Sequence, residues 1–369
     1  MIILKTRRER LLEPLQAVIG IVERRHTLPI LSNVLIESSG HELSLTATDL
    51  EVQIRTTAQI DEGAEKQSVT ISARKLYDIL RSLPGEASVA LESKDSKLTV
   101  KAGKSRFSLQ TLAGQDFPTV AATDDAGIEL TLPQKTLKAL LERVQYAMAQ
   151  QDVRYYLNGT LFKVSGGELT LVATDGHRLS YTAEKLPQEY GSAEVILPRK
   201  SVSELIKLLS PTDDPVRITL RANQAQFVFG SIDLLSKVID GKFPDYARVI
   251  PTNYAKHLAL QRLDLLQALQ RAAILSNDKI RGVRLLLSKN NLAVVCTNNE
   301  QEEAQEDLDV VYGQEAIDIG FNLTYLMDVL NHLTAETIQC SFGDANSSVL
   351  ITVAGSEDRF KYVVMPMRI

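Results

Sequence analysis

Several features that mark common protein classes are missing from this sequence of 369 residues. Two cysteines, Cys296 and Cys340, are too few for a disulfide framework or a four-ligand zinc site, so we expect both to be small buried apolar groups. No uncharged apolar run approaches the roughly 18 residues that span a bilayer, and the start, MIILKTRRER, becomes charged before a signal-peptide core could form. We therefore expect a cytoplasmic protein.

Catalytic and cofactor signatures are also absent. The sequence contains no Walker A loop, no G-x-G-x-x-G, no G-x-S-x-G and no H-E-x-x-H. Only TDGHRL, in which Asp175, His177 and Arg178 lie close together, looks like an active site. A hydrolytic enzyme centred on Asp175 and His177 is the alternative that this cluster leaves open, but a nucleophile with its base and orienting group does not accompany it. We predict no catalysis, no metal and no cofactor.

Composition and length favour a protein of two or three folded domains. Apolar residues make up 44% and charged residues 24%, as in soluble globular proteins. A chain of this length suits domains of about 100 to 150 residues each. The net charge of -5 argues, taken alone, against a nucleic-acid binder.

The sequence contains three similar blocks with a period of about 125 residues. LTATD, LVATD and the weaker VVCTN place Thr48, Thr174 and Thr297 at equivalent positions. ISARK, ILPRK and IGFNL recur at nearly the same spacing, and each block closes on Phe-Pro or Met-Pro. We predict three similar domains, at residues 1–122, 128–251 and 252–369.

Each block carries two helical patterns among alternating ones. Apolar residues at spacings 0, 3, 4 and 7 give one buried stripe per helix, as at Leu76, Ile79, Leu80 and Leu83. The predicted helices cover residues 6–22, 73–83, 133–148, 198–209, 261–275 and 322–333. The period-two stretches between them predict antiparallel strands, in the order strand, helix, three strands, repeated twice per block. The fold class is therefore α+β, with two helices packed on antiparallel sheets in each domain.

Charge is distributed unevenly between these elements. Five of the six helical ranges carry net positive charge, although the whole chain is acidic. Helix propensity of Lys and Arg is one explanation, but Glu shares that propensity and is scarce in these helices. The other explanation is a helical surface that faces a polyanion through its phosphates.

The first and third blocks differ in the sign of their charge clusters. Lys104 and Arg106 belong to a basic segment, whereas acidic residues crowd residues 300–309. Such runs are often simply solvated faces. Their opposite signs would also suit a head-to-tail contact between two copies, and contacts of that kind can close into a ring.

Eight segments resemble the bacterial sliding clamp family, the beta subunits of DNA polymerase III. They are TLPILSNVL, KAGKSRFSLQTL, AQQDVRYYLNG, VATDGHRL, SKVIDGKFPDY, RAAILSN, NNEQEEA and YVVMPMR, and they extend over essentially the whole chain. The resemblance implies a DNA clamp fold in which two chains join head to tail into a six-domain ring. Helices would line the hole and sheets would lie outside, with duplex DNA passing through.

The same resemblance implies a processivity factor that slides on duplex DNA and tethers the replicative polymerase and other DNA-processing proteins. Its partners would be a second copy, duplex DNA bound without sequence preference, the polymerase subunit and the clamp loader. Proteins with short clamp-binding motifs would enter a pocket formed by Leu157, Thr174, Gly176, His177, Arg178, Leu179, Pro244, Arg248, Val249, Ser348, Val363, Met365, Pro366, Met367 and Arg368.

Within that pocket we expect an apolar floor and a more polar rim. Leu157, Leu179, Val249, Val363 and Met365 would form the floor. The expected rim consists of Arg178, Arg248 and Met367.

DNA and dimer contacts follow from the resemblance in the same way. The implied DNA contacts are Arg25, Gln151, Tyr155, Tyr156 and Lys200. The implied dimer contacts lie in the first and third blocks and are Lys75, Lys104, Arg106, Phe107, Leu109, Ile274, Leu275, Glu300 and Glu303.

Overall fold

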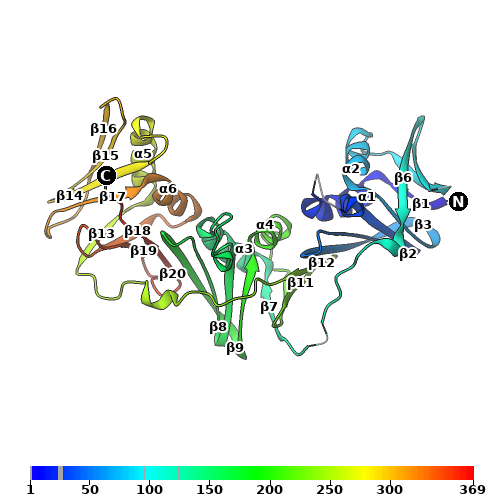
Figure 1. The fold of residues 1–369 in the computed structure, drawn as a ribbon, viewed down its shortest axis with the longest axis horizontal. Helices are drawn as coiled ribbons and strands as arrows, with labels where there is room; N and C mark the ends of the chain where they lie inside the picture. The colour runs from blue at the N-terminus through cyan, green and yellow to red at the C-terminus, as the bar shows by residue number, and fades with distance from the viewer. Residues whose placement is uncertain (1, 24–27, 95, 124) are drawn as a thin grey trace. The chain divides into compact units, whose positions relative to one another are not determined.

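The computed structural model describes residues 2–23, 28–94, 96–123 and 125–369 (Figure 1). The chain divides into two compact units, one formed by residues 1–138 with 203–238 and the other by residues 139–202 with 239–369. Each unit therefore combines one terminal block with half of the central block. Within the described ranges, no helix is both long enough and apolar enough to cross a bilayer.

Six α-helices occupy the described residues, and each lies within its predicted range. They are α1 (Arg8–Val18), α2 (Ala73–Ser82), α3 (Gln134–Val144), α4 (Arg199–Leu208), α5 (Arg262–Ala272) and α6 (Leu323–His332). The apolar stripe that predicted them is the buried face, as Leu76 and Leu80 show in α2. The helix predictions are therefore confirmed. They succeeded because apolar residues that recur with a period of about 3.6 residues mark the face of a helix that packs on a sheet.

The first unit contains one long antiparallel sheet. Its order is β1-β4-β5-β6-β3-β12-β11-β10-β7, with β2 paired to β3. The strands are β1 (Ile2–Arg7), β2 (Asn33–Thr48), β3 (Val52–Ser72), β4 (Ser88–Lys94), β5 (Lys97–Ala102), β6 (Ser105–Ala113), β7 (Ile128–Pro133), β10 (Pro215–Leu220), β11 (Gln224–Phe229) and β12 (Ile232–Lys237).

The second unit contains two antiparallel sheets, ordered β13-β18-β19-β20-β9-β8 and β16-β15-β14-β17. The β8 and β9 hairpin is drawn in green in Figure 1. The strands are β8 (Gly159–Thr174), β9 (Arg178–Pro198), β13 (Lys256–Gln261), β14 (Gly282–Ser288), β15 (Asn291–Thr297), β16 (Glu303–Asp309), β17 (Ile317–Asn322), β18 (Thr337–Phe342), β19 (Val349–Val353) and β20 (Phe360–Val364).

The predicted strand pattern is wrong in the first two blocks. The sequence pattern predicted four strands between the two helices of each block, but the structure has two, because β2 and β8 run unbroken for 16 residues and β3 and β9 for 21. Each pairs with its hairpin partner along almost its whole length, so the ladder continues where a turn was expected. In the third block β16 and β17 are separate, and the segment between them folds back as Tyr312 Oη donates to the Glu315 carbonyl at 2.6 Å.

Strand pairing joins neighbouring blocks across the predicted domain boundaries. Within the first unit, β12 of the central block pairs with β3 of the first block, from Ile232 opposite Thr56 to Ser236 opposite Val52. Within the second unit, β20 of the third block pairs with β9 of the central block. The backbone hydrogen bonds of these strands are thereby satisfied across block boundaries. The three-domain division itself stays a prediction.

Candidate functional site

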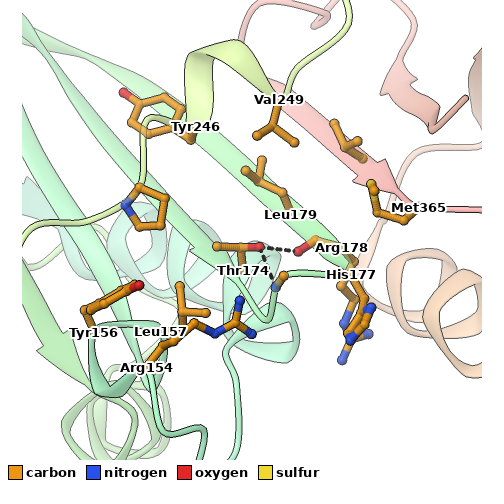
Figure 2. A pocket seen from close by; sticks show the side chains of 13 residues that line it. Arg154, Tyr156, Leu157, Thr174, His177, Arg178, Leu179, Tyr246, Val249 and Met365 are labelled. Carbon is orange, nitrogen blue, oxygen red and sulfur yellow. Dashed lines mark hydrogen bonds between the residues drawn. The ribbon is translucent and has the colours of Figure 1, made fainter.

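The turn between β8 and β9 is held by its own side chains. Thr174 Oγ1 donates to the Arg178 carbonyl at 2.6 Å and accepts from the Gly176 N–H at 3.1 Å, as Figure 2 shows by dashed lines. Asp175 Oδ1 accepts from the N–H groups of His177 and Arg178 at 2.9 and 3.0 Å. Gly176 has φ of 88°, which glycine adopts without strain. The turn therefore fixes where β9 begins.

The first block repeats this turn with different side chains. Thr48 and Asp49 make the equivalent hydrogen bonds, while Leu50 stands at the position of Gly176 and takes φ of 78°. Three residues later Gln53 exchanges two hydrogen bonds with the backbone of Val120, at 3.1 and 2.8 Å. The end of the first block is thus bound by Gln53, at the position that Leu179 occupies in the central block. The same hydrogen-bonded turn is therefore followed by a covered surface in the first block and by an open one in the central block.

A cavity of about 180 Å³ opens beside the turn in the second unit. Its walls come from the turn, the segment before β8, the segment after β12 and the end of β20 (Figure 2). The lining residues are Arg154, Tyr156, Leu157, Thr174, Gly176, His177, Arg178, Leu179, Pro244, Tyr246, Val249, Val363 and Met365. Most of this surface is apolar, so the cavity suits aliphatic or aromatic groups better than a charged substrate.

The expected division into floor and rim is partly wrong. Leu157, Leu179 and Val363 are buried at 2%, 3% and 1% exposure and do form the floor. Val249 and Met365, expected there too, are 46% and 48% exposed because they project from chain segments that cross the edge of the cavity. They supply an apolar rim, which increases the apolar area available to an occupant.

Arg178 was expected on the rim and is instead a buried link to α6. Its guanidinium contacts Asp175 at 3.0 Å, Asp328 at 2.5 Å and the Tyr146 carbonyl at 2.6 Å, and only 9% of its side chain is exposed. It also lies 4.3 Å from the centre of the Tyr325 ring. A buried cation requires such partners, so its charge is already satisfied by this chain. Its role is to hold the turn against α6.

Arg154 forms another wall of the cavity by packing on the turn. A Cβ atom added to Gly176 would lie 3.0 Å from an Arg154 guanidinium nitrogen, so a larger residue would require this side chain to shift. Asp152 orients Arg154 through bonds of 3.0 and 2.8 Å, and these bonds lower the pKa of Asp152 to about 2. The sequence reasoning missed Arg154, Tyr156 and Tyr246 as lining residues, and it placed Tyr156 among the DNA contacts instead. None of the three belongs to an apolar pattern that would have indicated it.

Five expected pocket residues lie outside the cavity lining. Arg248 is exposed and pairs with Asp245 at 2.8 Å, and Ser348 lies 3.3 Å from the Tyr254 hydroxyl. The other three follow Met365 in the tail: Pro366, Met367 and Arg368. The Met365 N–H donates to the His177 carbonyl at 2.8 Å, so the tail begins at the cavity and then leaves it. These five residues stay predictions as contacts for a longer partner.

The expected DNA contacts have different surroundings. Gln151 and Tyr155 are exposed on the segment before β8, with Tyr155 57% exposed. Tyr156 is half-buried and faces the cavity, while Lys200 is half-buried in the first turn of α4. Arg25 lies outside the described residues. The structure tests none of these residues for DNA contact.

The expected dimer contacts lie on two strand edges and two helical segments. Residues 105–110 of β6 pair with β5 on one side only, and in its sheet β16 pairs with β15 alone. Ile274 is 78% exposed, unusual for a large apolar side chain, and Leu275, Phe107 and Leu109 are half-buried. The charged members are exposed: Lys75, Lys104, Arg106, Glu300 and Glu303.

The acid–base hypothesis for Asp175 and His177 finds no support in this geometry. Both Asp175 carboxylate oxygens are occupied, one by the backbone of the turn and the other by Arg178. Among the described residues no group of acidic, His and Cys side chains could hold a metal ion. Cys296 and Cys340 are buried, and burial raises the pKa of their thiols to about 11 and about 12. Low thiolate character makes both poor nucleophiles.

Comparison with known protein families gives three consecutive matches. Models of the DNA polymerase III beta subunit match residues 2–121 with the N-terminal domain, 131–245 with the central domain and 247–368 with the C-terminal domain. The beta sliding clamp of Pseudomonas putida is 47% identical over 363 residues, which cover 98% of each chain.

Two solved structures resemble the fold closely. A sliding clamp from Pseudomonas aeruginosa, bound to griselimycin, has a TM-score of 0.95 and 45% identity, with 100% of both chains covered. The beta sliding clamp of C. crescentus, with polyethylene glycol bound to a putative beta-motif tethering region, has a TM-score of 0.93 and 36% identity. That comparison covers 100% of this chain and 99% of the other.

Proposed function

Since this chain belongs to the DNA polymerase III beta subunit family, we propose that two copies close head to tail into a ring that encircles duplex DNA. The protein is a sliding clamp, a non-catalytic processivity factor. The threefold repeat supports this function, because a ring needs equivalent domains and an active site does not. A clamp holds its polymerase on DNA by topology, so it needs no affinity for a particular sequence.

The ring would close through the two unpaired strand edges. β6 and the turn before it present Arg106 and Lys104 beside half-buried Phe107, and the segment at β16 presents Glu300 and Glu303. Opposite charges would orient the approach of the two copies, while burial of Phe107 and its apolar neighbours would supply most of the stability. Pairing the two edges would also cover backbone groups that otherwise invite aggregation.

We assign the cavity beside Leu179 to short extended segments of partner proteins. Such a segment would carry a Gln and one or two large aliphatic or aromatic side chains. Burying each anchor contributes about 1.5 to 3 kcal/mol, less the cost of ordering the peptide, so one motif should bind at about micromolar strength. Weak single sites allow the polymerase, the clamp loader and other partners to exchange.

The ring's inner surface would contact DNA through phosphate groups. Basic helices supply the attraction, and Gln151, Tyr155, Tyr156, Lys200 and Arg25 are the proposed further contacts. Salt screens such contacts, so the direct affinity for DNA should be weak and should fall as salt rises. A protein that works on bacterial DNA in this way belongs in the cytoplasm.

Retention on DNA of different topology tests the function. The full chain is loaded by a clamp loader onto a nicked circular plasmid, and half of the sample is then linearised with a restriction enzyme. Gel filtration should find the protein with the circle and lose it from the linear form, because only a free end releases a ring. Equal retention on both forms would contradict encirclement.

A further inference from the structure

The last residues of the chain rest on two glycines of the second unit. The Met367 N–H donates to the Gly320 carbonyl of β17 at 2.8 Å. The Ile369 side chain lies over Gly320 and over Gly282, the first residue of the neighbouring strand β14. The tail thus adds one backbone hydrogen bond and one apolar contact to the edge of the β16-β15-β14-β17 sheet.

Both glycines are needed for close approach and not for backbone freedom. Neither is among the residues with positive φ. A Cβ on Gly320 would lie 2.5 Å from the Met367 carbonyl oxygen and 2.8 Å from Ile369 Cδ1. A Cβ on Gly282 would meet three carbons of Ile369 at 3.0 to 3.3 Å. Glycine in a strand commonly marks such a site, where another backbone approaches.

The tail connects this glycine pair to the cavity. Met365 forms part of the cavity rim, and its N–H is bonded to the His177 carbonyl. Two residues later Met367 is bonded to Gly320, so Pro366 stands between two fixed points. Because proline restricts φ, a displacement at Met367 is passed to Met365 instead of being absorbed between them.

We propose that Gly282 and Gly320 are positioning residues for the partner pocket. Together they form a glycine shelf that seats Met367 and Ile369 and thereby holds Met365 at the rim. Neither glycine lines the cavity, so both act only through the tail. This inference rests on the proposed function of the cavity. It predicts that an added methyl group on the shelf weakens partner binding although the cavity itself is unchanged.

The first test compares Gly320→Ala with Gly313→Ala in the full chain. Gly313 has nothing within 4 Å of a built Cβ and no positive φ, so it controls for the glycine-to-alanine change itself. The probe is a labelled ten-residue peptide with one Gln, one Leu and one Phe, followed by fluorescence anisotropy. We expect Gly320→Ala to weaken binding about tenfold, equivalent to ~1.4 kcal/mol, and Gly313→Ala to leave it unchanged.

A spectroscopic readout separates tail position from binding. With carbon-13 methionine methyl labels, Gly320→Ala should shift the signals of Met365 and Met367 and leave buried Met148 in place. Unmoved signals for Met365 and Met367, or unchanged peptide affinity with the tail displaced, would overturn the proposal. If the native chain failed to bind the peptide, the proposed function of the cavity would be wrong. The methyl signals would still test whether the two glycines hold the tail in position.

The second test uses rescue by a change in the tail. The Cβ of Gly282→Ala meets only the Ile369 side chain among its three nearest atoms, so Ile369→Ala should restore most of the affinity lost in Gly282→Ala. It should not rescue Gly320→Ala, whose nearest contact is the Met367 backbone. Each double variant is compared with Ile369→Ala alone, which isolates the coupling. Equal rescue of both glycine variants, or rescue of neither, would contradict the shelf.

Discussion

Single residues decide which copy of a repeated turn borders a cavity. The turns at Thr48 and Thr174 share their hydrogen bonds. The first is followed by Gln53, whose amide binds the backbone of Val120 at the end of the first block, and the second by Leu179, which forms the floor of a cavity. A polar side chain at this position holds the chain in place, and an apolar one leaves a surface for a partner.

Asp328 on α6 should matter for the cavity although it is not among its lining residues. Replacing it by Asn removes one carboxylate from the buried Arg178 guanidinium, which keeps Asp175 as its remaining carboxylate partner. Loss of a partly buried charge-assisted bond should destabilise the second unit by about 1 to 3 kcal/mol. Thermal unfolding and peptide affinity are measured together. Asp78→Asn, on the exposed face of α2, is the matched control, and an equal effect of both variants would contradict the role of Asp328.

Thiol reactivity should follow burial. The pKa of Cys296 is raised to about 11 and that of Cys340 to about 12, because burial disfavours the thiolate. Both thiols therefore stay protonated at pH 8, and reactivity should increase only as the pH rises toward those values. We expect native protein to react slowly with Ellman's reagent and denatured protein to release two equivalents at once, one for each cysteine. Rapid reaction of the native chain at pH 8 would exclude the buried arrangement.

At the scale of elements, the chain leaves edges and short helical segments unpartnered. β6 and β16 each have a side without a neighbouring strand over part or all of their length in the described chain. Ile274 and Leu275 end the short helix Ala273–Leu275 that follows α5. These features belong to the first and third blocks, and a second copy is the partner that we propose to cover both.

Replacing Ile274 and Leu275 by Ala should convert the dimer into monomers. Each truncation removes about 1.5 to 3 kcal/mol of apolar burial, so the dissociation constant should rise more than about 100-fold. Sedimentation of labelled protein at nanomolar concentration measures the change. Leu263→Ala, which truncates another exposed apolar side chain at the start of α5, serves as control and should leave the dimer intact. A double variant that stayed dimeric would rule out this interface.

At the scale of the whole molecule, the surfaces proposed for assembly and for partner binding are different. The proposed interface involves β6, β16 and the segment at Ile274, whereas the cavity uses the β8 to β9 turn, the segment after β12 and the tail. The surfaces share no residue. A clamp built in this way can change partners while the ring stays closed.

Deleting Met365–Ile369 should separate the two activities. The deletion removes a rim residue of the cavity and uncovers the glycine shelf, so binding of the peptide and of a polymerase should be lost. The dimer and its lifetime on circular DNA should stay close to those of the full chain. Ile274→Ala with Leu275→Ala is the reciprocal control, since it should lose the dimer and keep peptide binding. Undiminished peptide binding by the truncated chain would mean that the pocket is assigned wrongly.

The sequence by itself determined the repeats, the helices and the family. The helices were predictable because their apolar spacing directly encodes the buried face, as Leu76 and Leu80 show. The motif TDGHRL was noticeable in the sequence because Asp175, His177 and Arg178 lie close together, and its Thr and Asp hydrogen-bond a local turn. Local hydrogen bonds and periodic burial depend on residues close in sequence, so a linear pattern contains them.

Only the tertiary structure decided how the cavity is built and which side chains are free. It turned Arg178 inward because Asp328 and Tyr325, far along the chain, offer a charge and a ring at the right distance. It brought Arg154 against Gly176, and it seated Ile369 on Gly282 and Gly320. These contacts join residues that lie far apart in the sequence and share no periodic spacing. Close packing in three dimensions brings them together, and a linear pattern does not contain that information.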